Sequence, residues 1–179
     1  MGEPAPAGGP TQDEVMAISL FKMGLRHGDV VLDCGCGTGK VAIAASQVAK
    51  TVHAVDRRPG AIRYAQRHAE TAGVNNIEFF CGEAREFLDG DRIFDCAFVG
   101  GSKEIDKLLP LLAQKVKRTI VVNAIMVSTL FRVVETMQQI GIFREAVHVQ
   151  VSCSHPIAGS IMFRPIDPVY IVVGSGTAC

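Results

Sequence analysis

Tryptophan is absent from this chain of 179 residues, tyrosine occurs only twice, and 18 basic side chains balance 18 acidic ones. Proteins that hold a phosphate backbone or stack on bases use basic patches and aromatic platforms, so this composition disfavours a general nucleic-acid-binding role. Charged residues at 20% and hydrophobic residues at 48% exclude a disordered chain. The length predicts a single domain.

Long apolar runs and a secretory signal are also missing. A helix that crosses a bilayer needs about 20 apolar residues, whereas the best candidate, residues 120–122, ends at Asn123. The first residues have neither the basic region nor the apolar region of a secretory signal. The six cysteines are therefore expected to be reduced thiols, and the sequence predicts a cytoplasmic protein without a membrane partner.

The chain divides into an arm, one domain and a short tail. Residues 1–10 are almost entirely Gly, Pro and Ala, which predicts a flexible N-terminal arm. The domain is expected over residues 11–174, and residues 175–179 are expected to fray. Thr11 and Glu14 have the spacing of a capping box, which predicts a first helix over residues 11–23.

Apolar runs and helical patterns then alternate, which is typical of a largely parallel sheet with helices on both faces. Buried strands are predicted at residues 30–32, 51–55, 77–81, 94–99, 118–125 and 169–173, and a strand near the sheet edge at residues 143–152. Helices are predicted at residues 41–49, 59–72, 103–116 and 128–140, with a kink or break at Pro110. Three prolines in residues 153–168 predict a loop or an irregular hairpin.

A glycine-rich segment, DCGCGTGK at residues 33–40, follows the first strand and precedes a helix. Ligands of such sheets bind beyond the carboxyl ends of the strands. A phosphate-binding P-loop requires glycine where Cys34 stands and a hydroxyl where Val41 stands, so that interpretation fails. A dinucleotide fingerprint requires its third glycine at the position of Lys40, which leaves a nicotinamide enzyme as the second choice.

The remaining pattern, Asp-x-Gly-x-Gly-x-Gly, resembles the first motif of class I S-adenosylmethionine (SAM)-dependent methyltransferases. Asp33 can accept a hydrogen bond from the ammonium group of the cofactor or from the amides of the loop. Gly35, Gly37 and Gly39 let the backbone approach a ligand without a Cβ in the way. SAM has no phosphate, so no P-loop lysine is required.

Two further strand ends support this interpretation. Asp56 ends the second strand, where a carboxylate can accept hydrogen bonds from both ribose hydroxyls; the alternative is a solvated Asp before a turn. Residues 81–84, CGEA, resemble the Gly-Asp-Ala segment of the same superfamily, in which the backbone of the residue at the position of Ala84 faces the adenine. Glu83 departs from that pattern.

The segment after the fourth strand indicates the acceptor. It reads VGGS at residues 99–102 and lacks the Asn/Asp-Pro-Pro-aromatic motif of enzymes that methylate amino groups of nucleic acids. Cys96 and Cys153 do not suit the nucleophile of pyrimidine-carbon methyltransferases. The two glycines leave space for a bulky acceptor, and Ser102 is expected to cap the helix that starts at Lys103.

Together with GPT at residues 9–11, AVDR at 54–57 and NA at 123–124, these motifs resemble the decarboxylating precorrin (cobalt-precorrin-6B) methyltransferases of cobalamin biosynthesis, from residue 9 to about residue 173. The resemblance implies a doubly wound α/β fold, a mostly parallel seven-stranded Rossmann-like sheet whose last strand is antiparallel. It also implies a homotetramer, and methyl transfer from SAM to carbon 15 of the tetrapyrrole with loss of carbon dioxide from the ring C acetate. Residues 115–118, KVKR, replace a Pro-Gly-Gly turn of many relatives, and residues 153–165 are variable in the family.

The resemblance assigns cofactor binding to Thr11, Asp33, Gly35, Cys36, Gly37, Thr38, Gly39, Asp56, Ala84 and Gly100. Because the tetrapyrrole carries many carboxylates, cations near the strand ends and in the late loop are expected to bind it. The predicted substrate-binding residues are Arg57, Arg85, Ser102, Lys103, His155 and Arg164, and Arg58 is a further candidate cation. Cys34 and Cys36 do not have metal-ligand spacing, and no catalytic side chain or metal site is predicted.

Other functions stay open at this point. The chain could methylate another acceptor such as RNA, which would give salt-dependent RNA affinity. It could bind SAM without catalysis, or it could be a nicotinamide-dependent oxidoreductase. The substrate ring could be with or without cobalt.

Overall fold

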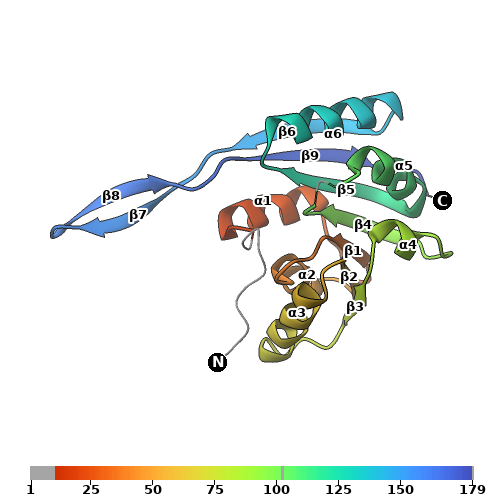
Figure 1. Ribbon diagram of the computed structural model, residues 1–179, viewed down its shortest axis with the longest axis horizontal. Helices are drawn as coiled ribbons and strands as arrows, with labels where there is room; N and C mark the ends of the chain where they lie inside the picture. Colours follow the sequence, from red (N-terminus) through yellow and green to blue (C-terminus); the bar gives the residue numbers. More distant parts are fainter. Residues whose placement is uncertain (1–10, 102, 179) are drawn as a thin grey trace.

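The computed structural model describes residues 11–101 and 103–178. Seven strands form one sheet in the order β3-β2-β1-β4-β5-β9-β6; β9 runs antiparallel to both β5 and β6, and the other pairings are parallel (Figure 1). The strands are β1 (Val30–Cys34), β2 (Thr51–Asp56), β3 (Ile77–Cys81), β4 (Phe94–Val99), β5 (Val116–Ala124), β6 (Phe143–Val149) and β9 (Val169–Ser175). The predicted sheet is therefore confirmed, including the position of β6 at one edge. The prediction that residues 77–81 form a buried strand was wrong, because β3 is the other edge strand and none of its residues is buried.

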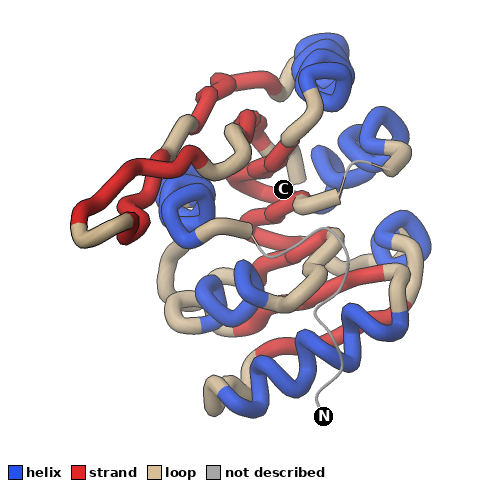
Figure 2. Tube along the Cα trace, turned by 60° about the vertical axis from the view of Figure 1, so that its left-hand side comes forward, coloured by secondary structure: helices blue, strands red, loops and turns tan. Residues whose placement is uncertain are grey.

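Helices cover both faces of the sheet (Figure 2). One core lies under α1 (Asp13–Met23), α2 (Lys40–Ser46) and α3 (Pro59–Thr71), and the other under α4 (Ala84–Leu88), α5 (Ile105–Lys115) and α6 (Val127–Gln139). In β1, Val31 belongs to the first core and Leu32 to the second, and both are fully buried. Burial on both faces explains why the central strands have continuous apolar runs.

A long hairpin projects from the body of the molecule (Figure 1). It consists of β7 (Ser152–Ile157) and β8 (Ser160–Pro165), which pair with each other in a separate sheet. Ala158 and Gly159 form the turn with φ of 45° and 78°, the signs that a two-residue type I′ turn requires. The sequence predicted a loop or an irregular hairpin, and the structure has a regular one. A two-stranded sheet has only edge strands, where proline is tolerated.

The structure contradicts the capping box predicted for the first helix and the break that was one alternative at Pro110. The N-cap of α1 is Gln12 rather than Thr11, and no side-chain hydrogen bond caps it. Glu14 instead accepts a hydrogen bond from Sγ of Cys153 on the hairpin at 3.5 Å, so the capping box does not form. In addition, α5 continues through Pro110. Burial of several leucines of α5, each worth about 2 kcal/mol, outweighs a proline cost of about 3 kcal/mol.

Residues 176–178, which follow β9, are tied to the body of the domain. Backbone N–H groups of residues 176–178 donate to carbonyl oxygens of residues 118, 113 and 116, at 2.8 to 3.0 Å. This part of the chain was expected to fray, and hydrogen bonding of its backbone accounts for the difference. No helix within the described ranges has both the length and the apolar character needed to cross a membrane.

Candidate functional site

A cavity of about 420 Å³ opens at the carboxyl ends of β1, β2, β3 and β4. It lies at the edge of the sheet where the order of the strands reverses between β1 and β4, the position expected for ligands of such folds. Its volume is within the range of about 300 to 1,000 Å³ that is typical of small-molecule sites. Its walls come from the glycine loop after β1 and from the residues that follow the next three strands.

The backbone of the glycine loop is fixed from both sides. The N–H groups of Gly35 and Cys36 both donate to the carbonyl oxygen of Val55 in β2, at 2.8 and 3.0 Å. Gly35 has a φ of 76°, and a Cβ at this position would lie 3.1 Å from the backbone nitrogen of Gly101. The loop after β4 thus packs directly on the loop after β1, and Gly35 makes that close approach possible.

Gly39 has a different role from the one that the sequence predicted. Its φ is 75°, and a Cβ added there would lie 2.9 Å from Cβ of Ala65 in α3. Gly39 therefore faces helix α3, whereas Gly35 and Gly37 line the cavity. The third glycine of the motif allows α2 to start close to α3, because a side chain at this position would separate the two helices.

Asp33 is a buried carboxyl group at the cavity. Asp33 is 1% exposed, and neither of its side-chain oxygens has a hydrogen-bond partner among the described residues. Burial raises the pKa of Asp33 to about 7, and the nearby charge of Asp56 acts in the same direction. The N–H of Ala42 opposes this shift, although it does not meet hydrogen-bond geometry. A carboxyl group in this state is ready to accept a cationic hydrogen-bond donor.

Asp56, at the end of β2, is fully engaged by its neighbours. Oδ1 accepts from the backbone N–H of Arg58 at 3.0 Å and from its Nε at 2.9 Å. Oδ2 accepts from the N–H of Gly37 at 3.0 Å and from Nη2 of Arg58 at 2.9 Å. Burial alone would raise the pKa of Asp56, but these hydrogen bonds hold it below its usual value, so the group is a carboxylate at neutral pH.

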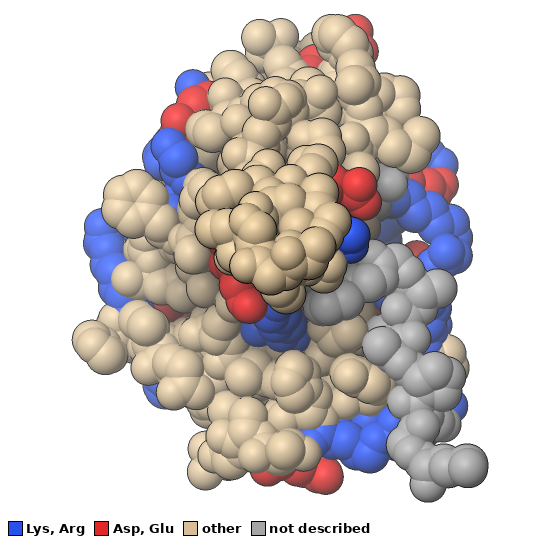
Figure 3. All heavy atoms as spheres, turned by 90° about the vertical axis from the view of Figure 1, so that its left-hand side faces the viewer, with Lys and Arg blue, Asp and Glu red and all other residues tan. Residues whose placement is uncertain are grey.

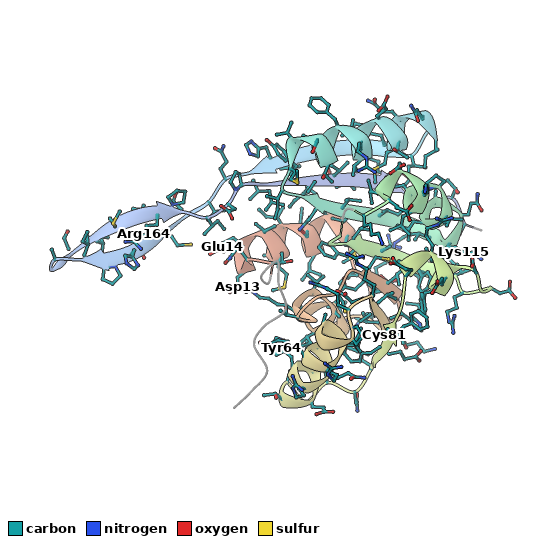
Figure 4. All side chains as sticks on the ribbon, in the orientation of Figure 1. Asp13, Glu14, Tyr64, Cys81, Lys115 and Arg164 are labelled. Atoms are coloured by element: carbon teal, nitrogen blue, oxygen red, sulfur yellow. The ribbon has the colours of Figure 1, made fainter. Side chains whose placement is uncertain are left out.

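Lys40 connects the glycine loop to the start of α1. Its Nζ donates to the carbonyl oxygen of Thr11 at 2.8 Å and forms an ion pair with Oδ1 of Asp13 at the same distance. Asp13 lies at the first turn of α1 (Figure 4), and both Thr11 and Lys40 line the cavity. The ammonium group is therefore committed to protein atoms, which agrees with the failure of the P-loop interpretation.

The structure brings together most of the predicted site. Eleven of the predicted residues line the cavity: Thr11, Asp33, Gly35, Cys36, Gly37, Thr38, Asp56, Arg57, Ala84, Gly100 and Lys103. Arg85 instead pairs with Glu104 at 3.8 Å, and Ser102 lies outside the described residues. His155 and Arg164 lie on the exposed hairpin and are not among the residues that line the cavity; Arg164 pairs with Cys153 toward the base of the hairpin (Figure 4).

Sequence reasoning missed three kinds of cavity residue. Lys40 was considered only as a phosphate ligand, and its contact with Thr11 depends on how the chain packs. Phe98 and Leu108 supply buried apolar surface to the cavity wall. Phe98 could have been found from its place one residue before the end of β4, close to the glycines that follow the strand. No local signal marks Leu108, because it reaches the cavity from α5.

The cavity residues fit a nucleoside that carries an amino acid. The unpartnered carboxyl of Asp33 suits an ammonium group, the glycine loop has no Cβ where Gly35 and Gly37 line the cavity, and Asp56 is the residue type that receives a ribose diol. Lys40, the lysine of the glycine loop, is not directed to a phosphate, since it is already paired. Within residues 11–101 and 103–178 no cluster of three or more potential metal ligands occurs.

The strand order, the antiparallel β9 and a glycine-walled cavity at the switch point define the Rossmann-like fold of methyltransferases. Within that class, the chain belongs to the precorrin methyltransferase domain family, whose model matches residues 6–174.

Similar proteins agree with this assignment over nearly the whole chain. A protein of Methanosarcina acetivorans, described as a probable cobalt-precorrin-6B C(15)-methyltransferase (decarboxylating), is 48% identical over 177 residues, or 96% of each chain. A protein of Methanocaldococcus jannaschii with the same description is 31% identical over 162 residues, which cover 90% of this chain and 88% of that one. The crystal structure of precorrin 8w decarboxylase from Methanobacterium thermoautotrophicum superposes with a TM-score of 0.90 at 28% identity, covering 95% of this chain and 92% of that chain.

Proposed function

We propose that the protein is a SAM-dependent methyltransferase that methylates carbon 15 of cobalt-precorrin-6B, or of its cobalt-free form, and removes carbon dioxide from the ring C acetate. The reaction is the one named for the relatives with up to 48% identity. The observation that carries the proposal is the cavity itself, in which an unpartnered buried carboxyl of Asp33 and the carboxylate of Asp56 flank the glycine loop. That combination suits a cationic nucleoside and not a phosphate.

In this proposal the chain mainly positions the reactants. SAM supplies an electrophilic methyl group. Asp33 accepts a hydrogen bond from the ammonium end, Asp56 receives the ribose, and the backbone at Ala84 borders the adenine. Gly101, where an added Cβ would have nothing within 4 Å, leaves room for the macrocycle after β4. Alignment of this kind is worth up to about 7 to 11 kcal/mol in well-oriented systems.

Cations at the cavity margin are assigned to the carboxylates of the tetrapyrrole. Arg57 and Lys103 line the cavity and are exposed, so their side chains are accessible to a ligand there without a change in the backbone. Lys103 also forms an ion pair with Glu83 at 3.2 Å. The apolar wall formed by Phe98 and Leu108 excludes water, and a carboxylate taken out of water loses carbon dioxide more readily.

The proposed assembly is a homotetramer. The hairpin carries exposed apolar side chains, with Ile157 at 49%, Ile161 at 67% and Phe163 at 64% exposed. Figure 3 looks onto its end, where uncharged surface fills the centre of the view and Lys and Arg lie mostly toward the margins. Burial of this surface in a second copy would remove it from water. The proposed location is the cytoplasm, which agrees with five free cysteines among the described residues.

The direct test incubates the purified protein with cobalt-precorrin-6B or precorrin-6B and methyl-labelled SAM, and traps released carbon dioxide. We expect label in the tetrapyrrole and an equal amount of trapped carbon dioxide. Asp56→Asn is expected to abolish both at low cofactor concentration, while the control Asp106→Asn, which removes an exposed carboxylate from α5, leaves both unchanged. Binding of S-adenosylhomocysteine without transfer to either tetrapyrrole would refute the proposed reaction.

Lys40 provides a prediction about the cavity wall. Lys40→Met removes the contacts with Thr11 and Asp13, so the start of α1 is held less firmly against the cofactor. A part-buried ion pair of this kind contributes about 1 kcal/mol, so we expect the dissociation constant for S-adenosylhomocysteine to rise about fivefold. Isothermal titration calorimetry measures it.

The matched control is Lys22→Met. Lys22 lies on α1, the helix that Lys40 contacts through Asp13. Its side chain is as exposed as that of Lys40, at 24%, and it pairs at the same distance of 2.8 Å with Glu145, on β6. Its loss is expected to change the dissociation constant by less than about twofold, since it fastens α1 away from the cavity. An equal weakening by both substitutions would mean that α1 responds as a whole and that Lys40 has no specific role.

A further inference from the structure

The carboxylate that the proposed function assigns to the ribose has no acceptor capacity left. A carboxylate has about four lone-pair sites, two on each oxygen. In Asp56 each oxygen accepts two hydrogen bonds: the backbone and Nε of Arg58 donate to Oδ1, and the backbone of Gly37 and Nη2 of Arg58 donate to Oδ2. Both hydroxyls of a ribose can therefore bind only after two of the present donors have left.

Only the side chain of Arg58 can leave without rearranging the backbone. Gly37 belongs to the loop that the carbonyl of Val55 holds through Gly35 and Cys36. The N–H of Arg58 is fixed because the next residue, Pro59, begins α3. The guanidinium group, in contrast, is on a side chain that is 42% exposed, while that of Asp56 is 3% exposed. The carboxylate of Asp56 is thus held in the cavity wall, and the guanidinium group of Arg58 can move into solvent.

The guanidinium also lies where the ligand would lie. A Cβ added to Gly37 would be 3.8 Å from Nη2 of Arg58, so this group lies along the glycine loop on the cavity side. Arg58 and Asp56 both line the cavity. The two side-chain donors of Arg58, Nε and Nη2, contact the two oxygens side by side, which is the arrangement that the two hydroxyls of a ribose require.

We propose that the side chain of Arg58 is an internal competitor for the ribose: it occupies the diol position on Asp56, and a nucleoside binds only by displacing it. Arg58 therefore lowers the affinity for the cofactor and reduces the advantage of a ribose with both hydroxyls. The inference rests on the proposed function in one respect, which is that the ligand is a nucleoside with a vicinal diol.

The test compares Arg58→Met with the wild-type chain by isothermal titration calorimetry, using S-adenosylhomocysteine and its 2′,3′-dideoxy analogue. Methionine has a similar length and cannot donate to Asp56, so we expect S-adenosylhomocysteine to bind about three- to tenfold more tightly. The dideoxy analogue does not need the diol position, and its affinity is expected to stay within about twofold. Arg57→Met is the charge-matched control, since it removes a cation from the same cavity while all four donors to Asp56 remain.

Each outcome decides the matter. Weaker binding of S-adenosylhomocysteine by a folded Arg58→Met variant would make Arg58 a clamp on the ligand and overturn the inference, as would an unchanged affinity. An equal gain by Arg57→Met would assign the effect to net charge and would also overturn it. Absence of binding to the wild-type chain and to Arg58→Met alike would refute the proposed function itself. Thermal unfolding of each variant establishes that it is folded.

Discussion

Replacement of Asp33 by Asn is expected to stabilise the protein progressively as the pH rises and to weaken cofactor binding at the same time. The carboxyl group is buried without a hydrogen-bond partner among the described residues, and its pKa is raised to about 7. Asn has the same shape and cannot ionise. The folded state of the variant therefore never contains the buried, unpaired charge that the wild-type protein contains above neutral pH.

The sign follows from the two states of Asp33. Its pKa is raised from 3.8 to about 7 on folding, so its full contribution to stability is present below pH 3.8 and is lost as the pH rises through 7. This loss is about 2 kcal/mol at pH 5 and about 4 kcal/mol at pH 8. The Asn amide also lacks partners, at a cost that does not depend on pH. The difference in the free energy of unfolding between Asp33→Asn and the wild-type protein should therefore shift by about 2 to 3 kcal/mol in favour of the variant from pH 5 to pH 8.

Urea unfolding at several pH values measures the stability. Asp89→Asn, at an exposed position after α4, is the control, and its stability is expected to show no pH-dependent gain.

Calorimetry measures the second effect, the weaker binding of the cofactor. Loss of a charge-assisted hydrogen bond from the ligand ammonium to Asp33 should weaken S-adenosylhomocysteine binding about 10- to 100-fold. Binding of 5′-methylthioadenosine, which has no ammonium group, should be unaffected. A variant whose stability parallels the wild-type pH profile would show that the pKa of Asp33 is the same in the folded and unfolded states, and would contradict the prediction.

Stability gained where binding is lost is the signature of a residue kept for function. Asp33 was identifiable from the sequence because the glycine pattern begins with it, and the same pattern located the cavity. The central strands were equally readable, since burial on both faces gives continuous apolar runs such as residues 94–99. These features are local in the sequence and needed no knowledge of how distant segments pack.

Features that depend on tertiary contacts were not readable. The donation from Gly37 to Asp56 and the anchoring of Thr11 by Lys40 join residues that are 19 and 29 positions apart, so their distances are fixed only in the folded chain. The capping box failed for a related reason, because Glu14 is engaged by the hairpin. The helix through Pro110 shows that burial of one face can override a local breaker signal.

The sequence motif identified Gly39 correctly as a special position, but it did not predict the role that Gly39 has in packing. The sequence marked it as one of three glycines that admit a ligand, but its missing Cβ makes room for Ala65 of α3. Two contacts hold the loop and α3 together at this point: Gly39 lies against Ala65, and Nδ1 of His68 is 3.0 Å from the carbonyl oxygen of Thr38. Within the loop, the Gly39 N–H donates to the carbonyl oxygen of Cys36 at 2.8 Å. The glycine is thus required for packing beneath the cavity.

Gly39→Ala is consequently expected to lower the free energy of unfolding by about 3 kcal/mol. About 1 kcal/mol comes from a non-glycine residue at a φ of 75°, and about 2 kcal/mol from a Cβ that would lie 2.9 Å from Cβ of Ala65. Gly141→Ala separates the two terms, because Gly141 has a φ of 73° with nothing within 4 Å of an added Cβ, and should cost only about 1 kcal/mol. Urea unfolding of both variants gives the difference. Equal losses would show that α3 yields to the added methyl group and that the glycine serves the backbone conformation alone.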